Sequence, residues 1–324
     1  PTRQLSLFSQ DDMILMNQAL HAFKSLQLEQ AVELFQKYRK TFPRGHDVAA
    51  KTALAEFLLK GLQEAPNDLA ERVPYLCRLW DRFEDCVQSN SMNPHDRLIS
   101  EQKKAFFRGM LKEIEQTSPA CTVSIIGGIP LGYLFLEAEQ HEQAIPHLQG
   151  AIAEAPHNAS VYGYLGDAYW LRGNSKTARQ CYREGCSIDP SAIDWQHLKD
   201  DELIALRQEL LLLYDFDPEL ASGWLPSHAR VNGLFERKTV RIHEGLKEQV
   251  DEYLALRKSL EKKTDPVKLA RLFFRGIILC ENEEGLRLVK KIDPIDVRRR
   301  MKQANPELFA DFLPILPASP ARFH

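Results

Sequence analysis

Acidic and imidazole side chains cluster near residue 140, where they could in principle coordinate a metal ion. The cluster contains Glu137, Glu139, His141, Glu142 and His147. Two histidines on one helix face lie three or four residues apart, but His141 and His147 do not have that spacing. We therefore interpret the cluster as a polar turn between two helices. The sequence predicts no metal site, and no other stretch indicates a cofactor.

A second group of carboxylates could supply a general acid and a general base. It comprises Asp194, Asp200, Asp201 and Glu202, with Asp215, Asp217 and Glu219 beyond them. Aspartate is a preferred helix cap, and negative charge in a first turn is stabilised by the helix dipole. We interpret these residues as caps and first turns of the helices that follow.

Motifs for nucleophilic, redox or phosphate chemistry are missing. The chain contains no GxxxxGK[ST], GxGxxG, HExxH, CxxCH or GxSxG. Cys181 and Cys186 lie on different faces of one expected helix, so they cannot hold one ion together, and Cys181 is expected to be a buried apolar residue. We predict a non-enzymatic protein. An enzyme whose site no motif marks is one alternative.

The composition indicates a folded protein with a substantial core. The chain has 324 residues, of which 44% are hydrophobic and 27% charged, with a net charge of -3. Such a charge excludes a protein that is polybasic as a whole. No apolar run approaches the length of a membrane span, and the first residues lack the pattern of a secretory leader, so we expect no membrane association. The 6 cysteines form no CxxC pair, which favours a reducing compartment such as the cytoplasm.

The charge is unevenly distributed, and the last third is basic. Residues 225–310 carry 19 Lys and Arg against 13 Asp and Glu. A possible basic surface is formed by Arg237, Lys238, Arg257, Lys258, Lys262, Lys263, Arg298, Arg299 and Arg300. RNA or DNA could bind such a surface, and a regulator or assembly factor of this kind is a second alternative. Interleaved acids favour an ordinary solvated helix surface instead.

Helical signals extend along nearly the whole chain. Asx-Pro pairs, in which the Asx side chain can cap a helix that proline begins, occur at Asn93, Asp189, Asp217, Asp265, Asp293 and Asn305. Val123–Ile126 and Lys238–Ile242 resemble strands, but we interpret both as helix flanks. The fold class is therefore all-α. Glycine and proline in residues 223–236 predict a linker between a helical domain (1–222) and a basic helical region (237–313), with an extended proline-rich tail at 314–324.

Two stretches repeat one pattern with a period of 34 residues. The copy at 125–158 places Gly132, Ala144, Leu148 and Pro156 where the copy at 159–192 places Gly166, Ala178, Tyr182 and Pro190. A looser copy at 12–45 has Ala19, Ala31, Phe35 and Pro43 at these positions. Small residues let two antiparallel helices approach closely, and the terminal proline ends the second helix. Pro130 is expected in the first turn of the helix that follows Gly127 and Gly128.

This pattern resembles the tetratricopeptide repeat. The resemblance implies a superhelix of helix pairs, continued by further helices towards the C-terminus, that acts as a scaffold or adaptor. Its groove would bind a peptide or helix of a protein partner through Tyr133, Leu136, Glu137, Ser160, Gly163, Asp167, Trp170 and Leu171. These residues are mostly apolar, which suits an amphipathic helix or apolar segment. Neighbouring helices of the same chain could instead fill the groove.

Overall fold

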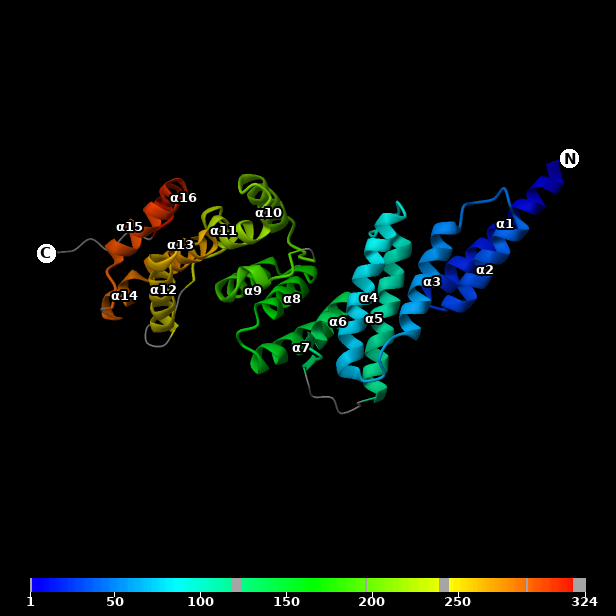
Figure 1. The fold of residues 1–324 in the computed structure, drawn as a ribbon, viewed down its shortest axis with the longest axis horizontal. Helices are drawn as coiled ribbons and strands as arrows, with labels where there is room; N and C mark the ends of the chain where they lie inside the picture. Colours follow the sequence, from blue (N-terminus) through cyan, green and yellow to red (C-terminus); the bar gives the residue numbers. More distant parts are fainter. Residues whose placement is uncertain (1, 118–123, 196, 239–244, 290, 317–324) are drawn as a thin grey trace. The chain divides into compact units, whose positions relative to one another are not determined.

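The computed structural model describes residues 2–117, 124–195, 197–238, 245–289 and 291–316 (Figure 1). These residues are all-α apart from one short hairpin, as the sequence predicts. The chain divides into two compact units, Pro1–Glu154 and Ala155–His324. The boundary expected at 223–236 lies inside the second unit.

The first unit is a series of helices in which most neighbours along the chain pack together, and α5 also packs on α1. Its elements are α1 (Thr2–Lys24), α2 (Leu28–Thr41), α3 (Ala49–Gln63), α4 (Leu69–Ser89), α5 (Arg97–Thr117), β1 (Ile125–Ile126), β2 (Ile129–Pro130), α6 (Leu131–Glu137) and α7 (His141–Glu154).

An aromatic cluster forms the core where α4, α5 and α6 meet. The Trp80 ring lies 4.9 Å from Phe83 and 5.1 Å from Phe106, measured between ring centroids. Phe107 meets Tyr133 of α6 edge to face at 6.2 Å. Aromatic pairs at these distances add to the free energy gained by burial. The first helix of the copy at 125–158 is thus held in the core by a helix outside the repeat.

The second unit begins with the best-matching repeat and continues through further helices to the last described residue. Its elements are α8 (Ala159–Leu171), α9 (Ser175–Ile188), the 3-10 turn η1 (Pro190–Ala192), α10 (Asp201–Leu213), α11 (Pro218–Val231), α12 (Gly245–Lys262), α13 (Pro266–Glu281), α14 (Glu283–Val289), α15 (Pro294–Ala304), α16 (Pro306–Phe312) and the 3-10 turn η2 (Leu313–Ile315).

Two apolar clusters stabilise this unit, and α11 contributes to both. One cluster joins α9, α10 and α11 around Tyr182 and Leu225. The other surrounds Phe273 of α13 and includes Trp224 of α11. Because α11 contributes to both clusters, it couples the repeat to the C-terminal helices.

All three repeat copies turn between their helices in the same way. Leu26, Glu139 and Gly173 occupy one repeat position, and their φ angles are 57°, 56° and 77°. The next amide donates to the carbonyl five residues back in each copy, at 2.9 Å from Gln27, 2.8 Å from Gln140 and 2.9 Å from Asn174. This is the hydrogen bond of a Schellman turn. The loose copy at 12–45 thus has the same turn as the two better copies.

The paired helices approach closely because a small residue faces a large one. A Cβ added to Gly166 would lie 2.3 Å from the Tyr182 ring, and one added to Gly132 would lie 2.4 Å from Leu148. Ala19 and Phe35 occupy the same two positions in the loose copy, and both are fully buried. The predicted role of the small residues is confirmed.

Four of the six Asx-Pro pairs begin an α-helix. Asp217, Asp265, Asp293 and Asn305 each accept a backbone hydrogen bond as the cap of α11, α13, α15 and α16. Asp189 caps only the short turn η1. Asn93 accepts from the His95 amide at 2.9 Å in the turn before α5.

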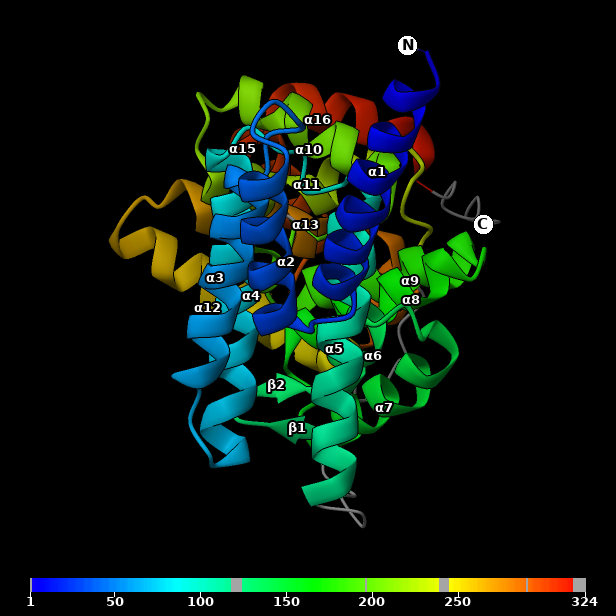
Figure 2. The ribbon, with the colours of Figure 1, turned by 90° about the vertical axis from the view of Figure 1, so that its right-hand side faces the viewer.

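The structure differs from the sequence predictions in two places. Ile125–Ile126 pairs antiparallel with Ile129–Pro130, so a hairpin beside α4 replaces the expected helix flank, and Pro130 is the cap of α6 (Figure 2). Residues 239–242 of the other strand-like stretch lie outside the described residues. The expected linker is mostly helix, since α11 extends to Val231 and the Phe235 ring beyond it is buried. Gly223 faces Ala270, so burial outweighs the weak helix propensity of glycine. Of the expected tail, residues 317–324 are likewise not described.

Gly166→Ala should destabilise the second unit by about 1 to 3 kcal/mol, because the added methyl group overlaps the Tyr182 ring. Gly223→Ala is the control, since its methyl group would lie 3.4 Å from Ala270. Urea unfolding, followed by circular dichroism, compares the two variants. Equal free energies of unfolding for both would show that Tyr182 does not require this glycine.

Candidate partner-binding surface

The candidate groove positions in the middle of α8 are covered by the chain itself. A Cβ on Gly163 would lie 3.2 Å from Ile193. Asp167 accepts hydrogen bonds from the Tyr182 hydroxyl at 2.7 Å and the Lys199 amide at 2.9 Å. Burial, reinforced by Asp167, raises the pKa of Tyr182, so this hydroxyl remains a donor. Both positions therefore stabilise the fold locally.

The two ends of α8 are more accessible. Ser160, near its start, donates to Asn158 at 2.8 Å. At the other end Trp170 is half-buried and Leu171 is 42% exposed. The Arg179 guanidinium lies 5.4 Å from the centre of the Trp170 ring, within cation–π distance. Trp170 and Leu171 form a partly exposed apolar surface, which we call the α8 tip.

Arg179 is itself held by a buried carboxylate. Two of its nitrogens contact Asp200 at 2.8 and 3.2 Å, and the Asp200 side chain has 0% exposure. Asp200 also caps α10 by accepting from the amides of Glu202 and Leu203. One carboxylate thus fixes the start of α10 and the cation beneath Trp170. This confirms the interpretation of Asp200 as a cap and adds a second role.

The groove positions of the first unit are buried. Tyr133, Leu136 and Glu137 lie beneath neighbouring helices of that unit. Lys103 of α5 contacts Glu137 at 2.5 Å and Glu84 at 3.2 Å. Burial alone would lower the pKa of Lys103, but these two carboxylates outweigh it and raise the pKa. At these three positions the chain's own helices cover the predicted groove residues.

The cluster near residue 140 is divided among different contacts. Glu139 pairs with Lys104 at 2.9 Å, and the His147 ring stacks on Phe135 at 4.7 Å. Burial lowers the pKa of His147. Among the described residues, no three His, Cys, Asp or Glu side chains are placed to share a metal ion.

The cysteines of α9 are unreactive in this setting. Cys186 is buried and Cys181 only half-buried, so the more buried residue is not the one that the sequence predicted. Burial raises the pKa of Cys181 to about 12 and also raises that of Cys186. The thiolate is the nucleophilic form, and neither residue reaches it near neutral pH.

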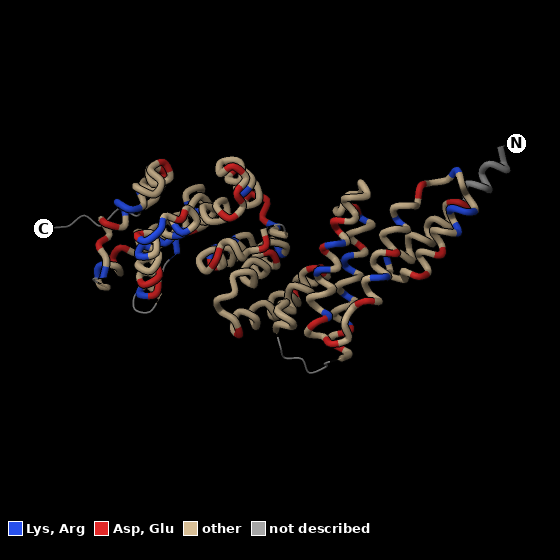
Figure 3. Tube along the Cα trace, viewed as in Figure 1, with Lys and Arg blue, Asp and Glu red and all other residues tan. Residues whose placement is uncertain are grey.

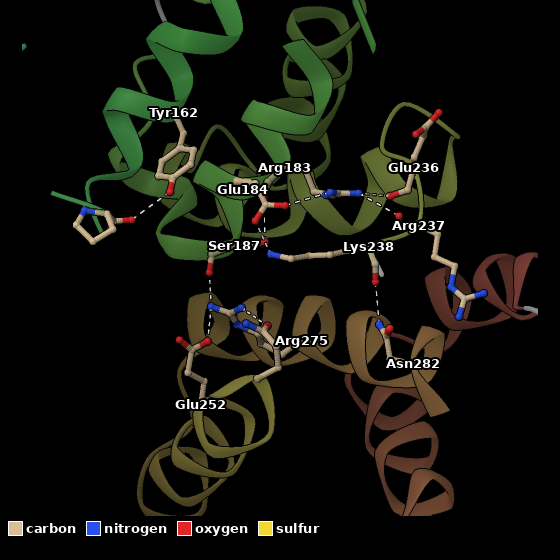
Figure 4. A network of polar contacts seen from close by, with 12 residues as sticks. Tyr162, Arg183, Glu184, Ser187, Glu236, Arg237, Lys238, Glu252, Arg275 and Asn282 are labelled. Carbon is tan, nitrogen blue, oxygen red and sulfur yellow. Dashed lines mark hydrogen bonds and ion pairs between the residues drawn. The ribbon is translucent and has the colours of Figure 1, made fainter. Parts of the chain in front are cut away.

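Arg237 and Lys238, two of the nine candidate basic residues, take part in an internal network (Figure 4). Lys238 pairs with Glu184 of α9 at 2.5 Å, and its carbonyl accepts from Asn282 at 2.8 Å. Arg237 donates to the carbonyl of Glu281. These cations join the repeat to α13 and are not a free surface.

Four more of the nine form ion pairs with acidic residues. Asp296 pairs with Arg257, Arg299 and Arg300, and Glu283 pairs with Arg298. Figure 3 shows the two signs of charge interleaved along α12 to α15. The other three of the nine are Lys258, Lys262 and Lys263. Their side chains are exposed and form no ion pair with a described residue.

Two buried charges that the sequence did not single out are central to the second unit. Glu281 is paired with Arg230 at 2.5 Å, and Arg275 with Glu252 at 2.5 Å. Burial raises the pKa of Glu281 although Arg230 opposes that shift. Because the residues of each pair are far apart in sequence, helical spacing gives no sign of the pairing.

Comparison with known proteins identifies the repeat. Residues 135–201 match the model of the tetratricopeptide repeat family. The human Superkiller complex protein 3 is 34% identical over 62 residues, which cover 19% of this chain and 4% of that protein. The matched segment is therefore a small part of both proteins. No solved structure matches this chain. No helix of the described residues is long and apolar enough to cross a membrane.

Asp200→Ala should destabilise the second unit by about 2 to 4 kcal/mol, because it removes the cap of α10 and leaves Arg179 with only the exposed carboxylate of Glu202. Asp217→Ala is a matched control: Asp217 also caps a helix through two amides at 3.0 Å, but it is exposed. Loss of an exposed cap costs about 1 kcal/mol. Thermal and urea unfolding measure both, and similar losses would contradict a role beyond capping.

The free energy of unfolding of the second unit should decrease as the pH is lowered, because of His228 on α11. Burial lowers the pKa of this imidazole from 6.5, although Asp311 acts in the opposite direction. Above pH 6.5 the ring is neutral in both the folded and the unfolded state. Below it the unfolded state binds the proton first, so folding loses free energy. Unfolding midpoints between pH 7.5 and 5.5 should fall less in His228→Gln, and parallel curves would exclude His228 as a cause.

Proposed function

We propose that this tetratricopeptide repeat protein is a non-enzymatic scaffold that binds a helix or apolar segment of a protein partner at the α8 tip. The observation that carries the proposal is the exposed Leu171 beside Trp170, at the end of the first helix of the best-matching repeat. Trp170 rests on Arg179, which Asp200 fixes. A rigid, partly exposed aromatic ring is typical of residues that dominate binding energy.

The remaining groove positions then have a supporting role. Gly163 and Asp167 hold α8 against the segment that follows η1. Tyr133, Leu136 and Glu137 hold α6 in the core of the first unit. A partner would contact the end of α8 rather than the whole line of positions that the repeat pattern indicates.

The relative supports a role in an assembly. The name of the Superkiller complex protein 3 states that it belongs to a complex. Tetratricopeptide repeats generally mediate contacts between proteins. A reducing compartment such as the cytoplasm would suit the free cysteines at 77, 86, 181, 186 and 280.

Nucleic-acid binding by the basic third is the second candidate. The exposed Lys258, Lys262 and Lys263 favour it. Six of the nine candidate cations, however, already contact acidic side chains or backbone carbonyls, which reduces the charge available to a phosphate backbone. We therefore rank it below partner binding.

Leu171→Asp should weaken capture of the protein partner by about tenfold or more, since it places a charge in an apolar contact. Gln180→Asp adds the same charge at an exposed position of α9 and should have no effect. Capture from native lysate is quantified by mass spectrometry, with circular dichroism as the check on folding. A photo-crosslinking residue at position 171, but not at 180, should label the same partner. Equal capture and labelling at both positions would exclude the α8 tip.

A further inference from the structure

A second candidate surface lies between α12 and α13. A pocket of about 360 Å³ is lined along α13 by Lys268, Arg271 and Arg275. Glu252 and Leu256 of α12 line it as well, together with Ile188 at the end of α9. Of these residues only Ile188 belongs to the segment that matches the repeat family. The pocket therefore combines charged and apolar walls outside the recognised repeat.

The three cations share one face of α13. They follow one another after three and then four residues, a spacing that aligns side chains along one side of a helix. The lining contains one carboxylate, Glu252, against these three cations. Two positive charges of the lining thus remain without a counterpart inside it.

Arg275 forms a fixed wall of the pocket. Its side chain is only 9% exposed and pairs with Glu252 at 2.5 Å. It also donates to Gln249 at 2.5 Å and to the Ser187 carbonyl, as Figure 4 shows for Ser187 and Glu252. This guanidinium is committed to contacts within the protein, so its role is to shape the site.

Lys268 keeps donors for a ligand. Its ammonium group donates to Ser259 at 3.1 Å and lies 3.7 Å from Asp265, beyond hydrogen-bond distance. Asp265 is already occupied as the cap of α13, accepting from the amides of Val267 and Lys268. An ammonium group has three donors, so an incoming acid can bind without breaking the cap.

Arg271 also keeps hydrogen-bond donors for a ligand. It donates to the Ile188 carbonyl at 2.9 Å and lies 3.8 Å from Asp189. Asp189 accepts from the Ser191 amide at 3.1 Å as the cap of η1. A guanidinium has five N–H donors, which leaves several of them for a carboxylate.

We propose that this pocket binds an acidic peptide segment of a protein partner. One carboxylate accepts hydrogen bonds from Lys268 and Arg271, and a neighbouring apolar side chain packs on Ile188 and Leu256. The proposal rests on the proposed function, that the chain binds a protein, and adds the chemistry of a second contact. Glu252 is paired with Arg275, so the carboxylate of the ligand meets the two remaining cations, Lys268 and Arg271.

The first test measures binding of a defined probe to the full chain. The probe is a fluorescein-labelled hexapeptide of alternating leucine and glutamate, and fluorescence anisotropy reports its binding at low salt. The same peptide with glutamine in place of glutamate should bind at least about tenfold more weakly, since the charge-assisted hydrogen bonds are lost. Equal binding of the two peptides would overturn the proposal. Preference for a phosphoserine peptide over the glutamate peptide would overturn the assignment to a carboxylate.

Variants with matched charge locate the site. Lys268→Gln with Arg271→Gln should weaken binding of the glutamate peptide by about tenfold or more. Lys262→Gln with Lys263→Gln removes the same charge from the exposed end of α12 and should change binding little. Lys268→Gln alone, at a 46% exposed side chain, separates loss of binding from loss of folding. Equal effects of the two double variants would show that only net charge matters, and would overturn the proposal.

Carbodiimide coupling gives an independent readout of position. It joins a peptide carboxylate to a lysine amine in direct contact, so Lys268 should be the main site of peptide attachment. Lys258, Lys262 and Lys263 are exposed internal controls. Attachment spread evenly over all four lysines would exclude the pocket. Because the α8 tip takes no part in this assay, failure here leaves the Leu171 experiment intact, and a negative Leu171 result leaves this one intact.

Discussion

The close approach of paired helices is the constraint on which the repeats depend. Gly166 and Gly132 leave no room for a Cβ because Tyr182 and Leu148 occupy that space. The Tyr182 hydroxyl then reaches Asp167, and Asp167 in turn holds the Lys199 amide. A missing methyl group on α8 therefore determines where the segment after α9 lies. That segment carries Asp200, which positions Arg179 beneath Trp170.

Buried charge joins the repeat to the helices that follow it in the second unit. Arg275 and Glu281 of α13 are almost fully enclosed, and each has a partner on another helix. Removing such groups from water is costly, and close ion pairs with additional hydrogen bonds offset much of that cost. Apolar contacts would serve stability equally well. The ionic contacts specify one geometry, because a small shift of α11 or α12 against α13 would leave a charge without its partner.

Local signals in the sequence were sufficient for the helices and the repeat. Proline after aspartate or asparagine marked four helix starts correctly, since cap and first turn need only neighbouring residues. Reasoning from neighbouring residues failed within α11. Gly223 and Pro226 predict a break there, but both are buried inside a continuous helix. The predicted groove residues differ in exposure for the same reason. Whether Tyr133 or Leu171 is accessible depends on helices distant in sequence, and periodicity contains no information about them.

The shared turn of the three copies has a consequence for how order spreads along the chain. Only Gly173 adopts its left-handed backbone conformation freely, whereas Leu26 and Glu139 hold it at a cost of about 1 to 2 kcal/mol each. In an isolated hairpin of α1 and α2, or of α6 and α7, this cost would weaken the turn. Packing of the adjoining helices on each hairpin offsets the cost. The turn between α8 and α9 has no such cost, so of the three hairpins this is the one whose geometry depends least on its neighbours.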